Sequence, residues 1–195
     1  MYLYGASGHA KVIIDILEAN QIKIDGLIDD NLEINELLGY PVFHQRNDLS
    51  PLIISIGNNR IRKMIAEKLN VKFGTAIHPS AIVSPSARIG EGTVIMPGAI
   101  INAEAIIGKH CIVNTGATID HECVIEDYCH IAPGVNVSGC TTIEEGTWVG
   151  VGSCVIQGLH IGKNCMIGAG SVLVKDIPDE VIAFGNPCRV IKQNV

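Results

Sequence analysis

The chain has 195 residues, and its 14 basic and 20 acidic side chains give a formal net charge of −6. Lysines and arginines do not cluster into the positive surface that a nucleic acid or an anionic membrane needs. No stretch approaches the roughly 20 apolar residues of a membrane helix, so polyanion binding and membrane insertion are disfavoured.

The chain begins Met1-Tyr2-Leu3-Tyr4-Gly5. This start lacks the charged and apolar regions of a signal peptide, so we expect a cytoplasmic protein.

Residues 1–73 predict a small Rossmann-like α/β domain. A strand over residues 2–4 runs into the glycine turn 5–8, after which apolar residues recur at helical spacing. A second strand ends at Asp29-Asp30, a third spans residues 51–56, and a helix covers residues 60–69.

The sequence of this domain predicts half of a nucleotide-binding site. The turn lacks the full GxGxxG pattern, and the domain is too short for both halves of a dinucleotide fold, which disfavours NAD or FAD. The glycines allow backbone amides at the helix N-terminus to approach a phosphate, and the following acids can accept hydrogen bonds from a ribose or base. A plain glycine turn with solvated acids remains the alternative.

Residues 74–195 are organised by a repeat of six. Stepping by six from Ile77 to Leu173 meets 17 aliphatic residues in succession, and 15 of the 17 residues that lie two positions earlier are small. This period predicts a solenoid in which three hexapeptides close one triangular coil of about 18 residues. The aliphatic side chains would fill its interior.

Seven cysteines show neither CxxC pairs nor a disulfide framework, so we expect reduced thiols and no metal site. Four of them fall in the small-residue column of the repeat and are predicted to fill the wall: Cys111, Cys123, Cys129 and Cys165.

Positions 18 residues apart stack on one another, and one such column consists of glycine only. Its members are Gly98, Gly116, Gly134, Gly152 and Gly170. Glycines have no side chains, so this column predicts a smooth groove along one edge of the solenoid. Four steps of the inter-strand spacing make the groove roughly 19 Å long, enough for an extended pantetheine arm. The alternative is that the glycines only supply the backbone angles of a sharp corner.

The segment from Asp120 to His130 interrupts the repeat with polar residues. His121 and His130 are nine residues apart, half a coil, so within one chain they are expected on opposite sides of the solenoid. If both serve one reaction, a neighbouring subunit must present His121, and a closed ring of three achieves this with one repeated interface. We therefore expect a homotrimer with active sites between subunits.

The chain resembles the bacterial hexapeptide-repeat sugar O- and N-acetyltransferases, which include sialic acid O-acetyltransferases and the UDP-4-amino-sugar N-acetyltransferases of the bacillosamine pathway. The segments that carry the resemblance are Tyr4 to His9, Leu27 to Asp30, Ile56 to Asn59, and Asn114 to His130. The resemblance implies a left-handed parallel β-helix that follows the α/β domain.

The resemblance also implies roles for particular residues. His121 would be the general base and Glu122 would raise its basicity. Acetyl-CoA would be contacted by His130, Val151 and Ala169. The sugar nucleotide would be held by Ser7, Gly8, His9, Asp29, Asp30 and Gly57.

The predicted function is direct N-acetylation of a nucleotide-linked amino-sugar, most closely a UDP-4-amino-4,6-dideoxy-sugar, by acetyl-CoA without a metal. A near-neutral imidazole suits removal of the proton from the acceptor, and Asn114 or a backbone amide would stabilise the oxyanion. O-acetylation of sialic acid and N-acetylation of a GDP-perosamine-type sugar are alternatives. A metalloenzyme of the γ-carbonic anhydrase kind, which expects an H-x4-H pair absent from this chain, and a non-catalytic trimeric binding protein are alternatives of other classes.

Overall fold

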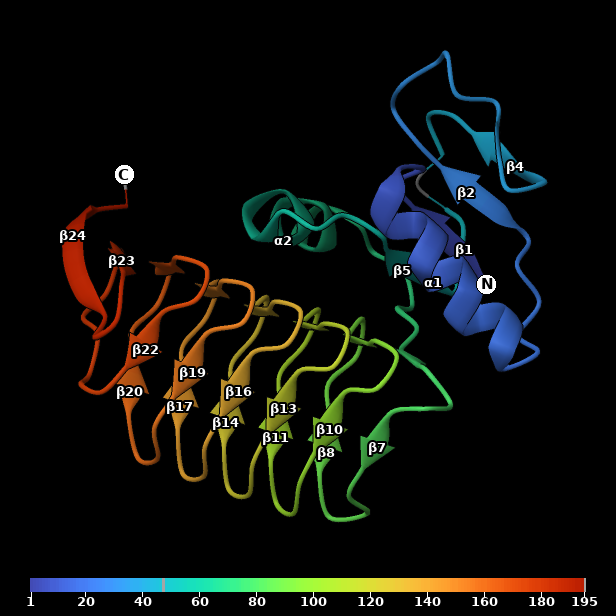
Figure 1. The fold of residues 1–195 in the computed structure, drawn as a ribbon. Helices are drawn as coiled ribbons and strands as arrows, with labels where there is room; N and C mark the ends of the chain where they lie inside the picture. Colours follow the sequence, from blue (N-terminus) through green and yellow to red (C-terminus); the bar gives the residue numbers. More distant parts are fainter. Residues whose placement is uncertain (47, 195) are drawn as a thin grey trace.

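The computed structural model describes residues 1–46 and 48–194, and its N-terminal part is an α/β unit (Figure 1). Its five-stranded sheet has the order β3-β4-β2-β1-β5, with β2, β1 and β5 parallel. The strands are β1 Tyr2–Tyr4, β2 Gly26–Ile28, β3 Glu36–Leu37, β4 Tyr40–Phe43 and β5 Leu52–Ile54. The helices are α1 Gly8–Ala19 and α2 Asn59–Lys68. The predicted strands and helices are present, and the β3–β4 hairpin is an addition that the sequence analysis did not predict.

The rest of the chain forms a parallel β-solenoid of two-residue strands in three sheets. The first sheet contains β6 Ala76–Ile77, β9 Val94–Ile95, β12 Ile112–Val113, β15 His130–Ile131, β18 Trp148–Val149 and β21 Met166–Ile167. The second contains β7 Ile82–Val83, β10 Ile100–Ile101, β13 Thr118–Ile119, β16 Asn136–Val137, β19 Cys154–Val155 and β22 Val172–Leu173. The third contains β8 Arg88–Ile89, β11 Ile106–Ile107, β14 Val124–Ile125, β17 Thr142–Ile143 and β20 His160–Ile161.

The predicted hexapeptide register is confirmed. Each strand pairs in parallel with the strand one coil away, as Val113 does with Ile131. The aliphatic column ends these strands and fills the interior, where Ile119 and Ile131 are fully buried. The four column cysteines are free and buried, and their thiols donate to backbone carbonyls inside the wall, as from Cys129 Sγ to Glu144 O at 3.0 Å. They are wall residues.

The C-terminal end of the solenoid is closed by β23 Val181–Phe184 and β24 Arg189–Gln193. β23 continues the first sheet beyond β21, and β24 pairs antiparallel with it. The α/β unit lies at the opposite end (Figure 1).

The three corners of the solenoid differ in composition. The glycine corner, between the first and second sheets, carries the column from Gly98 to Gly170, all in the left-handed backbone region. The histidine corner, between the second and third sheets, includes His121 and Glu122. The helix corner, between the third and first sheets, is covered by α2, as Figure 1 shows.

One buried arginine fixes α2 on the helix corner. Arg62 is 1% exposed, and its guanidinium donates to the carbonyls of His110 at 2.7 Å and Tyr128 at 2.9 Å in the solenoid. It also donates to the carbonyl of Gly57 at 3.0 Å. Burial lowers the pKa of Arg62 to about 10, so the side chain remains charged near neutral pH. Because a buried cation needs several acceptors, these contacts specify how the two parts meet.

Among residues 1–46 and 48–194, no helix has the length and apolar character that crossing a bilayer requires.

Candidate active site

The carboxyl edge of the α/β sheet holds a pocket of about 240 Å³. The carboxyl ends of parallel strands lie at one edge of the sheet, and ligands bind at this edge in open α/β sheets. Ten residues from β1, the β2 and β5 ends and α2 line it: Tyr4, Gly5, Asp29, Asp30, Ile56, Ile61, Met64, Ile65, Lys68 and Leu69. The walls are mainly apolar, with two carboxylates and one ammonium group.

Hydrogen bonds orient both predicted carboxylates. Asp29 accepts from the backbone amide of Ala6 at 2.7 Å and from that of Asn31 at 2.9 Å. Asp30 accepts from the Tyr4 hydroxyl at 3.2 Å and is exposed. Asp29 therefore holds the glycine turn, while Asp30 offers carboxylate oxygens to a ligand.

The other four predicted sugar-nucleotide residues lie at the same edge without lining the pocket. Ser7 is the N-cap of α1, and Gly8 and His9 are in its first turn. Burial, reinforced by Arg62, lowers the pKa of His9 to about 4, so its ring is neutral. Gly57 follows β5, and its carbonyl lies 3.4 Å from Nδ1 of His130 in the solenoid.

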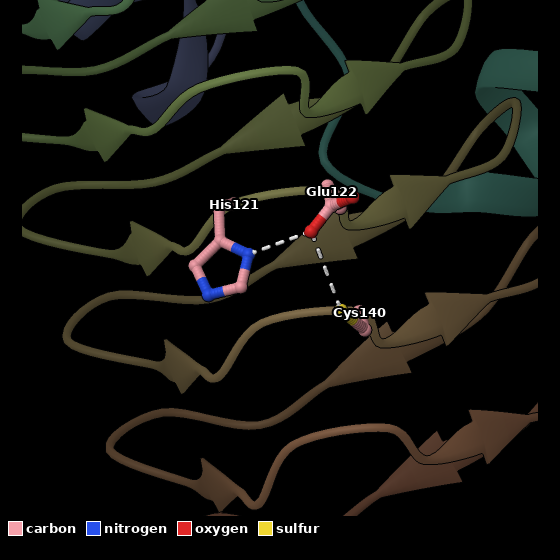
Figure 2. Close-up of side chains that lie close together, drawn as sticks. All are labelled: His121, Glu122 and Cys140. Atoms are coloured by element: carbon pink, nitrogen blue, oxygen red, sulfur yellow. Dashed lines mark hydrogen bonds and ion pairs between the residues drawn. The ribbon is translucent and has the colours of Figure 1, made fainter.

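His121 and Glu122 form a contacting pair at the histidine corner (Figure 2). His121 Nδ1 lies 3.1 Å from Glu122 Oε2, and both side chains are more than half exposed. Adjacent residues of a regular strand point apart, but Glu122 has a φ of 56°, which turns its side chain toward the ring. The pair lies between β13 and β14, at a corner and outside the regular strands.

Gly139 and Cys140 lie one coil beyond the histidine pair. The Cys140 amide donates to the His121 carbonyl at 2.9 Å, and Cys140 Sγ donates to Glu122 Oε2 at 3.7 Å (Figure 2). Desolvation and the Glu122 charge raise the pKa of the Cys140 thiol. The imidazole covers Gly139, where an added Cβ would lie 2.6 Å from both Cε1 and Nε2 of His121. Neither residue was predicted from the sequence, although the 18-residue stacking places them beside His121 and Glu122.

His130 lies on another side of the solenoid from His121, as the half-coil spacing predicted. It is in β15 of the first sheet and is 4% exposed. Nδ1 lies 3.4 Å from the carbonyl of Gly57, and Nε2 lies 3.0 Å from Asn114 Nδ2. Burial, reinforced by Arg62, lowers the pKa of His130 to about 3. Both ring nitrogens are engaged, so His130 is a neutral residue at the junction with the α/β unit.

The glycine corner has an open surface. An added Cβ at Gly116, Gly134, Gly152 or Gly170 would meet nothing within 4 Å. Val151 and Ala169 are exposed beside this column. Asn114 connects His130 to this corner. Its side-chain amide nitrogen contacts the His130 ring, and its side-chain oxygen accepts a hydrogen bond from the backbone amide of Thr115 at 2.8 Å.

The wall of the pocket that α2 forms was not predicted from the sequence. Ile61, Met64 and Lys68 recur at spacings of three and four on one helix face, and Met64 is 60% exposed. Amphipathic spacing could have found this face. The position of α2 against the sheet edge depends on tertiary packing.

Family models match both parts of the chain. The PglD N-terminal domain matches residues 1–69, and the bacterial transferase hexapeptide (six repeats) matches residues 86–121 and 140–175.

Solved structures match nearly the whole chain. A histidine-to-asparagine mutant of perosamine N-acetyltransferase from Caulobacter crescentus, in complex with CoA and GDP-perosamine, is 36% identical with a TM-score of 0.92, covering 98% of this chain and 96% of that one. The acetyltransferase domain of PglB from Neisseria gonorrhoeae, in complex with acetyl coenzyme A, is 37% identical with a TM-score of 0.90, covering 97% and 98%.

Curated relatives match over shorter lengths. UDP-N-acetylbacillosamine N-acetyltransferase of Bacillus subtilis is 44% identical over an alignment of 102 residues, and the match covers 46% of this chain and 47% of that protein. An uncharacterized protein of Acanthamoeba polyphaga mimivirus, L142, is 36% identical over 97 residues, which are 20% of its length. The chain thus matches less than half the length of these curated relatives.

The fold and these matches define a hexapeptide-repeat acetyltransferase with a left-handed β-helix, which confirms the predicted fold class. The chain belongs to the family of sugar N-acetyltransferases that combine a PglD-type N-terminal domain with this β-helix.

Proposed function

We propose that this protein transfers the acetyl group of acetyl-CoA to the amine of a nucleotide-linked amino-sugar, with His121 as the general base. The observation that carries this proposal is the contact between His121 Nδ1 and Glu122 Oε2. When Nδ1 carries the ring proton and donates a hydrogen bond to the carboxylate, Nε2 retains its lone pair. That nitrogen accepts the proton of the amine as the amine attacks the thioester carbonyl.

The pocket at the sheet edge supports a nucleotide as the handle of the acceptor. A base or ribose presents flat apolar faces and hydrogen-bond donors, and the pocket offers apolar walls with Asp29 and Asp30 as acceptors. Exposed Met64 and Ile61 would be covered by such a ligand. Ser7, Gly8, His9 and Gly57 flank the pocket at the same edge.

The glycine corner supports the binding of acetyl-CoA. Its smooth surface beside Val151 and Ala169 would allow the pantetheine arm to run parallel to the solenoid axis. The solved relatives that match this chain include complexes with CoA and with acetyl coenzyme A. His130 would contribute through its packing beside this corner, since its ring nitrogens already have partners.

Sites between subunits follow from the separation of these features. His121 lies at the histidine corner and the acetyl-CoA residues at the glycine corner, so a second copy of the chain would complete each site. A cyclic trimer brings these two corners together through one repeated interface. We include the homotrimer in the proposal.

The acceptor class that we favour is a UDP-4-amino-4,6-dideoxy-sugar. The match to the Bacillus subtilis UDP-N-acetylbacillosamine N-acetyltransferase supports it. The match to the GDP-perosamine complex favours a GDP-linked 4-amino-sugar as the second candidate. Both substrates carry an amine on a nucleotide-linked sugar, so the same base would serve either.

The test is thiol release from acetyl-CoA with UDP- and GDP-linked amino-sugars, sialic acid and CMP-sialic acid. We expect turnover with one amino-sugar nucleotide and a loss of about 100-fold or more in His121→Ala. His160→Ala is a matched control, because exposed His160 also pairs with a carboxylate, Glu144, at 3.0 Å. Turnover only with a sialic acid would overturn the N-acetylation proposal, and equal loss in both variants would overturn the base assignment.

A further inference from the structure

The histidine corner gathers three different metal-binding groups. The ligand atoms of His121, Glu122 and Cys140 all lie within 4.8 Å of one another (Figure 2). The nitrogen–oxygen separation is 3.1 Å and the oxygen–sulfur separation is 3.7 Å. Zinc bonds of about 2.0–2.3 Å in a tetrahedron place their ligands roughly 3.3–3.6 Å apart, so these two separations are close to the spacing between ligands of one ion.

We propose that His121, Glu122 and Cys140 form a binding site for Zn²⁺ and chemically similar divalent cations. Imidazole, carboxylate and thiolate are the groups that bind Zn²⁺ in proteins, and the thiolate disfavours Mg²⁺ and Ca²⁺. Three protein ligands leave the fourth position to water. All three side chains are exposed in the single chain.

Binding of the ion changes the protonation of Cys140 and His121. The ion bonds to the Cys140 sulfur as the thiol proton leaves to solvent, and it bonds to His121 Nδ1 in place of a proton. In neutral imidazole the remaining proton then resides on Nε2. The complex therefore forms with net release of one proton, and no group is oxidised or reduced.

This proton shift makes the ion an inhibitor, a consequence that rests on the proposed function. A lone pair on Nε2 is what the general base needs, and Nε2 loses it when the ion occupies Nδ1. Glu122 is likewise withdrawn from its contact with Nδ1. The cation is therefore a competitor of the acetyl-transfer reaction and not a cofactor for it.

The binding test uses Co²⁺ as a spectroscopic substitute for Zn²⁺. Titration of the metal-free protein with Co²⁺ should give a thiolate-to-cobalt absorption band that saturates at one ion per chain, and added Zn²⁺ should abolish it. We expect Cys140→Ser to lose the band and to bind Zn²⁺ at least tenfold more weakly. Cys154→Ser is the matched control, because Cys154 is also an exposed free thiol of the solenoid.

Two results would overturn the proposal: no thiolate band in the wild-type protein, or a band that survives in Cys140→Ser and disappears in Cys154→Ser. His121→Ala adds a second check, since it must weaken binding without removing the thiol. Activity separates the two inferences. A band lost in Cys140→Ser supports the metal site by itself, and if Zn²⁺ then binds without slowing acetyl transfer, the base role of His121 fails while the site stands.

Discussion

Two histidines nine residues apart in this chain have rings suited to different tasks. His130 is buried, and both of its nitrogens have partners. His121 is exposed, and its contact with Glu122 leaves one nitrogen for a substrate. The difference comes from position, since one residue is in a strand under the α/β unit and the other is in an uncovered corner. Residue type alone does not identify the base.

Gly139→Ala should impair the proposed base by moving the His121 ring, while His121 and Glu122 themselves stay unchanged. The new methyl carbon would lie 2.6 Å from Cε1 and Nε2 of His121, closer than real contacts allow, so the ring must move. Because a displacement of about 1 Å can cost on the order of 100-fold in rate, we expect kcat to fall by about tenfold to 100-fold. Steady-state kinetics with thermal unfolding as a folding check would measure this.

Gly74→Ala is the control for that substitution. Its nearest neighbours would be the ε-methyl and sulfur of Met1, the flexible end of a side chain that can shift. It should keep a rate within about twofold of the wild type. Equal kcat in Gly139→Ala and the wild type would contradict the positioning of His121 by Gly139.

At the scale of elements, the position of α2 depends on one buried cation. Arg62→Met should destabilise the protein by about 3 kcal/mol or more, because the carbonyls of His110, Tyr128 and Gly57 lose their donor inside the structure. It should also weaken binding of the sugar nucleotide more than binding of acetyl-CoA, since Gly57 and α2 belong to the nucleotide side. Chemical denaturation and calorimetric titration with each ligand would check both effects.

Arg60→Met tests whether charge loss on α2 is sufficient to explain such a result. Arg60 is on the same helix two residues earlier and is exposed. Its replacement should change the free energy of unfolding by less than about 0.5 kcal/mol. Similar losses in the two variants would show that Arg62 has no special part in the junction.

The junction should also respond to pH through His110. This residue is 3% exposed and stacks on Tyr128 with ring centroids 5.4 Å apart, and burial, reinforced by Arg62, lowers its pKa to about 4. The unfolded chain, with an ordinary histidine pKa near 6.5, then binds the proton more readily. The stability contributed by neutral His110 is therefore complete above about pH 6.5 and decreases as the pH falls toward 4.

By this linkage His110 alone should remove about 2 kcal/mol between pH 8 and 5. His110→Asn should lower the unfolding free energy at pH 8 through lost stacking, but its stability should decline less steeply toward pH 5. Urea denaturation across this range would compare the slopes. Parallel curves for the two proteins would show that His110 does not titrate in this way.

The solenoid was more predictable from the sequence than the junction. A strict period of six fixes which side chain enters the interior, so the strands from Ile77 to Leu173 follow from sequence alone. Arg62 gave no such signal, since a lone arginine on a polar helix is usually solvated. Its burial depends on carbonyls of coils more than 45 residues away. The β3–β4 hairpin was missed because its strands have two and four residues and lack a sustained pattern.

At the scale of the whole molecule, the separation of corners determines what one chain can do. The pocket and His130 lie on the side of the α/β unit, whereas His121 and Glu122 lie at a corner away from it. The 18-residue stacking fixed this arrangement in advance, because a half-coil offset cannot be changed by loop movement in a closed solenoid. Under the proposed function, assembly of several chains would bring His121 to the residues proposed to bind acetyl-CoA.

Mixed assemblies test the shared site directly. His121→Ala removes the base, and Ala169→Arg should obstruct the glycine corner, since Ala169 is exposed beside Gly170. Each variant alone should be inactive. In trimers of randomly mixed chains, a site between subunits works when one neighbour supplies an intact His121 and the other an intact glycine corner. That combination has a probability of about one quarter, because each condition is met half the time around a cyclic interface.

We therefore expect trimers reassembled from equal amounts of the two variants to recover about a quarter of the wild-type activity, and sedimentation analysis to give the mass of three chains. As the control, the two variants are assembled separately and then combined without dissociation of their trimers. This combination should stay inactive. If each chain held a complete site, every chain in the mixture would still carry one lesion, so no activity would return. Recovery thus requires that residues from two chains meet in one site.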